Sequence, residues 1–477
     1  MNRTMYDVAI IGAGVTGTSI ARKLSRYKLR IALLEKEADV SFGTSKANSG
    51  IIHGGFHHNK KYLKARLEIS GAAMFDQLQR ELGFPFRRCG ILVAAMHHDE
   101  MEAAAHLFRQ GQENGAPGIE FCSRERMLEL EPKLSQNVVG GVYAPSGGII
   151  EPYRFVFSLL ESAVKNGTTV YTEFEASHAE WAENCWNITA SDGRNILARY
   201  AVNAAGLYAD NISKMFGAEE YTIEARKGAY FLLDRLAEGH PQRVVFPVPS
   251  RISKGMLVIP TVEGTTLIGP TADHVDNKED KATEGNHLAL ISASAKLLVP
   301  SVSEQDAITN FAGLRPALND DFYIAFSEKV PRFLQVAGIQ SPGLTAAPAI
   351  ARMVKDMLLK DGLELSEDPS YDPFIRQTVP VRTLPAEKRA ELVEQNPAYG
   401  NIVCRCEEIS EAEIVEAIRH GHTTLDGIKF YTRAQMGRCQ GGFCTGKIIR
   451  LIQRETEIPY NKITKRGGDS LILEGEL

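Results

Sequence analysis

The chain has 477 residues, of which 44% are hydrophobic and 24% charged, and its formal net charge is −5. These values are ordinary for a globular protein of about two to four domains, and charges of both signs spread along the chain argue against a nucleic-acid-binding surface. No apolar run of about 18 residues is present, so we expect no transmembrane span. The odd number of cysteines and the glycine-interrupted N-terminal apolar stretch favour a cytoplasmic protein, with peripheral attachment to the inner face of the membrane as an option.

The first 35 residues carry a nucleotide-binding pattern. Residues 8–11 form an apolar run that predicts a buried parallel strand, and this run ends in Gly12-x-Gly14-x-x-Gly17. A predicted helix and a second strand follow, and that strand ends at Glu35. This is the βαβ dinucleotide fingerprint in its usual context.

Each residue type in this fingerprint has a physical reason. Gly12 permits a tight turn, Gly14 lets the backbone approach a pyrophosphate, and Gly17 lets helix and strand pack closely. Val15 and Thr16 open the helix, where unpaired backbone N–H groups favour an anion. The acid that closes the second strand would accept hydrogen bonds from a ribose 2′-hydroxyl and would repel a 2′-phosphate. At this point both NAD and FAD remain open as the nucleotide.

Hydrophobic periodicity predicts the remaining elements. A loop rich in Gly, Ser and His covers residues 41–58. Helices are predicted at 62–82, 99–114, 151–166, 284–298 and up to about 359, and strands at 89–95, 140–144, 168–174, 202–205, 308–316 and 333–338. Alternation over 226–271 predicts an antiparallel sheet inserted into the nucleotide-binding domain. Many prolines in 366–400 predict an extended linker.

Four cysteines lie close together near the C-terminus, as Cys404-x-Cys406 and Cys439-x4-Cys444. Thiolates on loops beside helix N-termini are typical of a metal site. The C-x-C spacing is tight for two ligands of one zinc ion, so the pattern favours a [2Fe–2S] cluster over zinc, with no metal as the third alternative. The other cysteines are predicted to be buried small side chains, and they are Cys89, Cys122 and Cys185. Basic residues near the thiolates would offset part of their charge, namely Arg405, Lys429, Arg433, Arg438 and Lys447. Surface-exposed sulfurs and the basic residues around Cys439 would form a docking patch for an electron acceptor.

Several further segments resemble a known family. They are Asn48-Ser-Gly-Ile-Ile-His-Gly-Gly55, Asn203-Ala-Ala-Gly206, Gly313-Leu-Arg-Pro316 and Ser341-Pro-Gly-Leu-Thr345. Together with the fingerprint they resemble the D-amino-acid-oxidase-like FAD dehydrogenases, in the branch of the glycerol-3-phosphate and L-2-hydroxyglutarate dehydrogenases. The tail from Cys404 to Cys444 is similar to the [2Fe–2S] domain of bacterioferritin-associated-ferredoxin type.

This resemblance implies an α/β fold. We expect a Rossmann-like FAD-binding domain with an inserted antiparallel-β substrate domain, followed by a small α-helical iron–sulfur domain. The expected boundaries are 1–85, 140–220 and 325–362 for the FAD-binding domain, 86–139 and 221–324 for the substrate domain, 363–399 for the linker, and 400–477 for the iron–sulfur domain and tail.

The resemblance also implies the residues that contact FAD. Glu35 would hold the adenosine ribose, Ala176 would contact adenine, and residues 44–50 would run along the flavin. The full expected set is Gly12, Gly14, Val15, Thr16, Gly17, Glu35, Thr44, Ser45, Asn48, Ser49, Gly50, Ala176, Gly206, Gly338, Gly343, Leu344 and Thr345.

Residues with catalytic chemistry follow the expected flavin segments. His53 is the first candidate for the base that accepts the hydroxyl proton, because it follows the flavin loop and imidazole titrates near neutral pH, and His57 is the second. Arg315 is expected to hold the carboxylate or phosphate of the substrate. Lys227 and Arg251, from the inserted sheet, are weaker candidates for the same role.

These features together predict a dehydrogenase. It would oxidise a small anionic secondary alcohol, glycerol 3-phosphate or a 2-hydroxy acid, by hydride transfer to FAD, and electrons would leave through the cluster to an acceptor protein or a quinone-linked partner subunit. Two alternatives remain open, an amine or imino-acid dehydrogenase on the same scaffold and a non-catalytic electron-transfer subunit.

Overall fold

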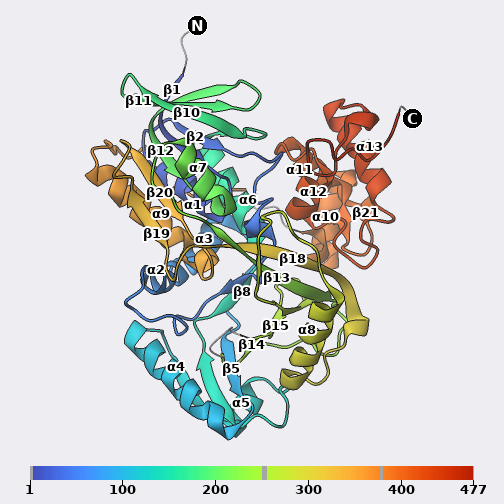
Figure 1. Ribbon diagram of the computed structural model, residues 1–477. Helices are drawn as coiled ribbons and strands as arrows, with labels where there is room; N and C mark the ends of the chain where they lie inside the picture. Colours follow the sequence, from blue (N-terminus) through green and yellow to red (C-terminus); the bar gives the residue numbers. More distant parts are fainter. Residues whose placement is uncertain (1–3, 250–254, 377–379, 476–477) are drawn as a thin grey trace.

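The computed structural model describes residues 4–249, 255–376 and 380–475, and two sheets dominate it (Figure 1). Arg251 lies outside the described residues. Among those residues no helix is long and apolar enough to cross a membrane.

The first sheet has eight strands and contains the N-terminal fingerprint. Its parallel centre consists of β1 (Met5–Ile11), β2 (Ile31–Leu34), β9 (Thr169–Tyr171), β12 (Asn195–Asn203) and β20 (Phe333–Ala337). Antiparallel strands extend it, namely β10 (Ala176–Ala182), β11 (Cys185–Ala190) and β19 (Tyr323–Phe326). The core strands β1 and β2 are almost fully buried, as expected of parallel strands covered on both faces. The predicted βαβ arrangement is therefore present.

Helices cover this sheet. The fingerprint helix α1 (Val15–Leu24) packs against α6 (Pro152–Lys165) and α9 (Gly343–Lys360). The single helix predicted for 62–82 is two helices, α2 (Leu63–Ala72) and α3 (Phe75–Leu82). A Cβ on Gly71 would lie 2.1 Å from the Thr345 carbonyl oxygen, so this glycine allows α2 to approach α9 closely before the chain turns.

The second sheet has nine strands and forms one wall of the central cavity. Its strands are β5 (Ile91–Ala95), β6 (Glu120–Ser123), β7 (Gly140–Ala144), β13 (Glu224–Leu233), β14 (Val244–Pro247), β15 (Leu257–Pro260), β16 (Thr266–Gly269), β17 (Asp273–Val275) and β18 (Ala307–Ala317). Helices α4 (Met101–Asn114), α5 (Arg124–Leu130) and α8 (Gly285–Leu298) pack on it.

Two details of this sheet differ from the sequence prediction. The pair β14–β5 is parallel, so the sheet is mixed rather than purely antiparallel. Strand β7 pairs with β5 and β6, which places residues 140–144 in this sheet and not in the FAD-binding domain as expected. Short strands β3 (Ile51–Ile52), β8 (Gly148–Ile150) and β4 (Phe86–Arg87) form a separate small sheet.

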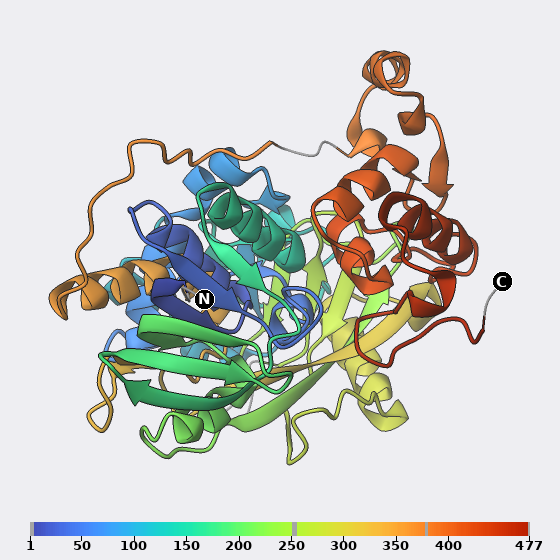
Figure 2. The same ribbon diagram turned by 90° about the horizontal axis from the view of Figure 1, so that it is seen from above.

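The C-terminal residues form a helical domain against one side of the molecule. It contains β21 (Ile402–Cys404), β22 (Ile409–Ser410), α11 (Glu411–Arg419), α12 (Leu425–Thr432) and α13 (Thr445–Thr456). The segment before it carries α10 (Ala386–Gln395) and runs across the top of the view in Figure 2. The Glu413 carboxylate accepts the Ser410 backbone N–H at 2.9 Å and completes the capping box that the sequence predicts for α11.

Candidate functional site

A cavity of about 890 Å³ is lined by residues of both large sheets. It lies where β1 and β2 end and where β13 and β18 face the nucleotide-binding sheet. Ligands of doubly wound sheets bind outside the carboxyl ends of the strands, and this volume is at the upper end of the range for small-molecule sites.

The fingerprint glycines lie at one end of this cavity, and a side chain on two of them would clash with neighbouring backbone atoms. Gly12 has φ of +101°, and a Cβ there would lie 2.5 Å from the Ala204 carbonyl oxygen. A Cβ on Gly17 would lie 1.9 Å from the Gly12 carbonyl oxygen, so helix and strand could not pack as they do. Gly14 is the N-cap of α1 and lines the cavity, and its helix N-terminus carries no side-chain cap. The turn therefore exposes backbone N–H groups to a ligand.

Glu35 lines the same end. Its carboxylate accepts the backbone N–H of Ala13 at 2.7 Å and that of Glu37 at 3.0 Å. Burial raises the pKa of Glu35 to about 7, although these two hydrogen bonds act in the opposite direction. The group is held by backbone donors alone, which leaves further lone pairs for a ribose hydroxyl.

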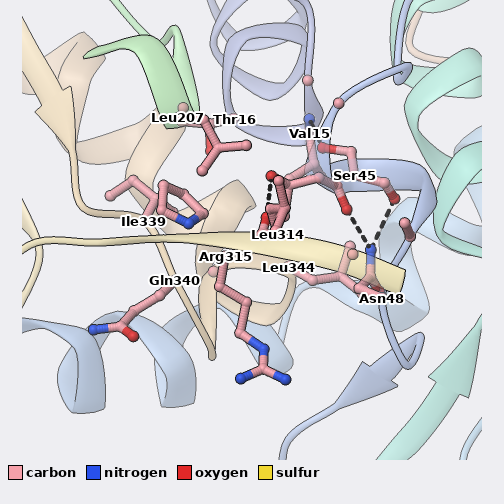
Figure 3. A pocket seen from close by; sticks show the side chains of 18 of the residues that line it. Val15, Thr16, Ser45, Asn48, Leu207, Leu314, Arg315, Ile339, Gln340 and Leu344 are labelled. Carbon is pink, nitrogen blue, oxygen red and sulfur yellow. Dashed lines mark hydrogen bonds between the residues drawn. The ribbon is translucent and has the colours of Figure 1, made fainter. Parts of the chain in front are cut away.

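The loop after β2 crosses the cavity and rests on β18 (Figure 3). The Ser45 hydroxyl accepts the Val15 N–H at 2.9 Å, and the Asn48 amide donates to the Ser45 carbonyl at 2.8 Å. The Thr44 hydroxyl donates to the Leu314 carbonyl at 2.6 Å. These bonds join the loop to the fingerprint helix at one side and to the second sheet at the other.

The expected reaction residues gather at the other end of the cavity. His53, His57 and Arg315 all line it. The His53 Nε2 lies 3.2 Å from the Ser341 hydroxyl, and the two histidine rings lie 5.7 Å apart edge to face. The Arg315 guanidinium donates to the Thr271 carbonyl at 2.9 Å, and Figure 3 shows it extending away from Val15 and Ser45.

A pair of glycines makes room for this arginine. Gly228 of β13 stands opposite Gly313 of β18. A Cβ on Gly228 would lie 2.3 Å from Arg315 Nη2, and a Cβ on Gly313 would lie 1.9 Å from the Ala47 carbonyl oxygen. Both strands therefore have glycine at the positions where the loop after β2 and the Arg315 guanidinium pack against the sheet.

Strand register adds two residues that the sequence analysis missed. Arg226 stands directly opposite Arg315. Tyr230 lies on the same face of β13 four residues further along, and all three side chains line the cavity. Burial raises the pKa of the Tyr230 phenol, while hydrogen bonds with Arg315 and Ser49 act in the opposite direction. The period-2 alternation of residues 226–230 predicts a strand. It does not show which of the two alternating sets of side chains faces the cavity.

Lys227 is a correction to the predicted site. Its side chain is buried and pairs with Asp280 at 2.9 Å and with Glu284 at 3.4 Å, so it is not among the cavity residues. Because neighbouring strand residues point to opposite faces, Arg226 takes the place expected of Lys227.

Most of the expected FAD residues line the cavity. They are Gly12, Gly14, Val15, Thr16, Glu35, Thr44, Ser45, Asn48, Ser49, Ala176, Gly206, Gly343 and Leu344. Gly17, Gly50, Gly338 and Thr345 lie behind this lining. Thr345 supports the site indirectly, because its hydroxyl accepts the His53 backbone N–H at 3.0 Å. The glycine N-cap of α1 without a side-chain cap, the acid after β2 and the cavity of about 890 Å³ fit FAD.

The four C-terminal sulfurs converge. Cys404 Sγ lies 3.9 Å from Cys406 Sγ, which lies 3.8 Å from Cys439 Sγ, and Cys404 is hydrogen-bonded with Cys444. Backbone N–H groups, that of Phe443 first, lower the pKa of the Cys439 thiol. Within the described ranges no group of three His, Cys, Asp or Glu side chains surrounds a single-ion position. The thiol set, with backbone donors aimed at sulfur, fits a [2Fe–2S] cluster.

The other cysteines and the basic neighbours differ partly from expectation. Cys122 and Cys185 are buried, whereas Cys89 is partly exposed. Arg433, one of these basic residues, is buried in ion pairs, whereas Arg438 pairs with Asp234 but stays 61% exposed. Arg433 is therefore not part of a docking patch, and the cluster sulfurs are less exposed than expected, because Cys404 and Cys444 are buried.

Two family models match the chain. Residues 7–357 match the FAD dependent oxidoreductase family, and residues 402–454 match the BFD-like [2Fe-2S] binding domain. The second match decides the C-terminal site in favour of the cluster over zinc.

Individual relatives agree with these matches. A glycerol 3-phosphate dehydrogenase of Caloramator mitchellensis is 42% identical over 474 residues and covers 99% of this chain and 98% of its own. The human mitochondrial L-2-hydroxyglutarate dehydrogenase is 27% identical over 74% of this chain and 88% of its own. The FAD-bound structure of the L-alpha-glycerophosphate oxidase from Mycoplasma pneumoniae superposes with a TM-score of 0.75 at 30% identity, over 79% of this chain and 100% of its own. The chain belongs to the FAD-dependent oxidoreductases, with FAD as cofactor and a C-terminal [2Fe–2S]-binding domain.

Proposed function

We propose that the protein is a dehydrogenase that oxidises glycerol 3-phosphate, or a small alcohol of the same anionic class, at its secondary hydroxyl. The observation that carries this proposal is the cation pair Arg226 and Arg315 in the cavity wall. Like charges directly opposite one another destabilise a sheet, so such a pair implies a bound anion. The name of the full-length relative, glycerol 3-phosphate dehydrogenase, supports the same substrate class.

The two arginines have no carboxylate at ion-pair distance among the residues that the structure describes. The Arg226 Nε is buried and makes no hydrogen bond to a described residue. Lys64 also lines the cavity, and the charge of Arg226 contributes to lowering its pKa, although burial is the larger cause. A phosphate dianion, or a carboxylate, would neutralise the positive charge of these side chains. Planar guanidinium groups bind such anions with two hydrogen bonds each.

With the anion held at the arginines, the hydroxyl-bearing carbon would face the flavin segment of the cavity. His53 lies in that wall, and its position fits the role of accepting the hydroxyl proton. Bound FAD supplies the two-electron acceptor for the hydride. Tyr230 and Thr271 would hold Arg315 in the orientation in which it receives the anion.

The C-terminal domain supports a dehydrogenase rather than an oxidase. A [2Fe–2S] cluster carries single electrons, which suits delivery to a partner protein or a quinone-linked subunit. The glycerophosphate oxidase structure aligns over its whole length but over only 79% of this chain. A domain that the oxidase does not match is therefore a candidate for the exit of electrons.

Anaerobic titration of the flavin absorbance tests the substrate. Glycerol 3-phosphate is expected to bleach the flavin band, whereas glycerol, which lacks the anion, is not. Bleaching by 2-hydroxyglutarate alone would move the enzyme to the hydroxy-acid class, and bleaching by proline or sarcosine alone would favour an amine dehydrogenase. If no member of this panel reduces the flavin, the catalytic proposal fails and a non-catalytic electron-transfer subunit is favoured.

A further inference from the structure

Six charged side chains form a buried network where the cluster domain meets the rest of the chain. Its members are the carboxylates Glu151, Glu263 and Glu407 and the guanidinium groups Arg235, Arg382 and Arg433. Arg433 Nε lies 3.0 Å from the Glu407 carboxylate, and Arg235 Nη2 lies 2.7 Å from it. The Arg433–Glu151 and Arg382–Glu263 pairs are hydrogen-bonded as well. The network holds three negative and three positive charges, so it is neutral as a whole.

The members come from every major part of the chain. Glu151 follows β8 beside the flavin-binding sheet, Arg235 and Glu263 belong to the second sheet region, and Arg382 lies in the linker. Glu407 and Arg433 belong to the cluster domain, and their side chains are only 3% and 8% exposed. Buried charges are stable only when opposite charges compensate them, so the ion pairs of the network form in one relative arrangement of these parts. Within the network the Arg382 Nε has no hydrogen-bond partner among the described residues, and the Arg235 side chain is 31% exposed.

The network also lies on a continuous path between the two cofactor loops. In the flavin loop, the Gly50 carbonyl accepts the Ile150 N–H at 2.8 Å, and Glu151 is the next residue. Glu151 pairs with Arg433, Arg433 pairs with Glu407, and Glu407 directly follows Cys406.

The cluster loop is packed tightly against this path. A Cβ on Gly437 would lie 2.5 Å from Cys406 Sγ and 3.1 Å from Glu407 Oε1. A second contact joins the flavin loop to the cluster domain, because Lys46 Nζ lies 4.8 Å from the ring centre of Phe430 on α12.

We propose that this network is a positioning device that fixes the cluster loop against the flavin loop, so that electrons pass between the two centres without movement of the cluster domain. The inference rests on the proposed exit of electrons through the cluster. Each transfer oxidises the flavin and reduces the cluster by one electron. The electron acceptor, a partner protein or a quinone-linked subunit, reoxidises the cluster after each transfer, so two transfers return reduced FAD to FAD with its protons released to water. No bond of the protein forms or breaks.

Attachment of the domain does not depend on the network alone. Phe157 of α6 packs edge to face on His422 and on Tyr431, with ring centres 4.6 and 5.7 Å apart. His422 also bonds the Asp39 carboxylate at 2.7 Å. The apolar contacts thus hold the domain to the molecule, and the ionic network is left to set its register. Buried polar groups specify register in other proteins, which is the role assigned here.

The variant Arg433→Met removes the cation that bridges Glu151 and Glu407. Arg438→Met is the matched control, because Arg438 pairs with Asp234 across the same interface but is 61% exposed. The bound flavin is photoreduced with EDTA under anaerobic conditions, without a mediator that could reduce the cluster directly, and reduction of the cluster is followed by its electron paramagnetic resonance signal. We expect transfer in Arg433→Met to slow about tenfold or more, as displacements of about an ångström do in other positioned reactions, and the control to stay within about twofold.

The midpoint potential of the cluster is the second readout. Without Arg433 the buried charge of Glu407 beside Cys406 loses one of its counter-charges, so the potential falls, and Arg433→Lys restores most of it. Glu151→Gln keeps the Arg433–Glu407 pair, so it slows transfer with little change in potential, and it decides the question if Arg433→Met does not assemble its cluster. Unchanged transfer in both variants would overturn the proposal. Because photoreduction needs no substrate, this result is independent of whether glycerol 3-phosphate is oxidised.

Discussion

Charged side chains are arranged in opposite ways in the flavin cavity and at the cluster interface. In the cavity, Arg226 and Arg315 face one another with no carboxylate at ion-pair distance among the described residues, and Glu35 accepts backbone N–H groups rather than a cation from that part of the chain. At the interface, by contrast, Glu407 is paired with three arginines and Arg433 with three carboxylates.

This difference distinguishes charged groups that bind a ligand from charged groups that hold parts of the protein together. Uncompensated charge is costly in a folded protein and persists where a ligand supplies the missing partner. Fully paired charge needs no ligand and fixes the arrangement of the segments that carry it. The cavity therefore has the electrostatics of a site for an anion at one end and a sugar hydroxyl at the other, whereas the interface has those of a permanent joint.

Removing Arg315 is the strongest test of the uncompensated cations. Arg315→Ala is expected to lose about 2–5 kcal/mol of substrate binding, or roughly thirtyfold or more in KM, because the anion then lacks its buried partner. Bound FAD should be retained, since the fingerprint and the flavin loop are untouched. Anaerobic stopped-flow reduction and the flavin content of the purified protein measure both effects.

Arg199→Ala is the control for this variant, because Arg199 makes a 3.5 Å surface pair with Asp7 and should leave both quantities unchanged. Loss of FAD from Arg315→Ala would show that the arginine supports the cofactor instead of the substrate.

Glu35 offers a test through pH. Its folded pKa of about 7 lies above the ordinary value of 4.5, so between these values the folded protein binds more protons than the unfolded chain. Stability therefore falls as pH rises through this window, by at most about 3 kcal/mol. Melting temperatures of the FAD-free protein between about pH 4.5 and 7.5 should show this fall, and Glu35→Gln should flatten it. Parallel curves for the two proteins would mean that the carboxylate is compensated after all.

Replacing Arg226 is expected to weaken substrate binding and to raise the stability of the substrate-free protein. Arg226→Met should raise KM about tenfold, because one of two guanidinium groups facing the anion is lost. It should also stabilise the substrate-free protein by a few tenths of a kcal/mol, since like charges no longer stand directly opposite. Steady-state kinetics and thermal melting measure the two effects. A loss of stability would indicate a structural partner for Arg226 and would remove the argument for a bound anion.

Local motifs made much of this molecule predictable. The turn from Gly12 to Gly17, the acid at Glu35 and the paired cysteines depend on residues close in sequence, and the structure places them as a βαβ turn and a sulfur cluster. The prediction of one helix over 62–82 was wrong in one respect. The helix is interrupted between α2 and α3, close to the position where Gly71 packs against α9.

Tertiary pairing determined what the sequence analysis missed. Whether Arg226 or Lys227 faces the cavity depends on the register of β13 with β18, and a shift of one residue exchanges them. The burial of Arg433 depends on carboxylates that are far away in sequence, of which Glu151 lies 282 positions earlier. The residues close in sequence do not reveal which face of a strand points into the cavity, and they do not reveal a pair between residues so far apart.

Tyr230 should give the smallest of these effects. Tyr230→Phe removes only the hydroxyl that bonds Arg315 and Ser49, while the ring keeps its stacked position 5.0 Å from Phe311. Loss of one such hydrogen bond costs about 1 kcal/mol, so KM should rise about fivefold with little change in kcat. Kinetics under the conditions used for Arg315→Ala measure this. If the hydroxyl acts through Arg315, its removal should have almost no further effect in an Arg315→Ala background, whereas additive losses would show that Tyr230 contacts the substrate independently.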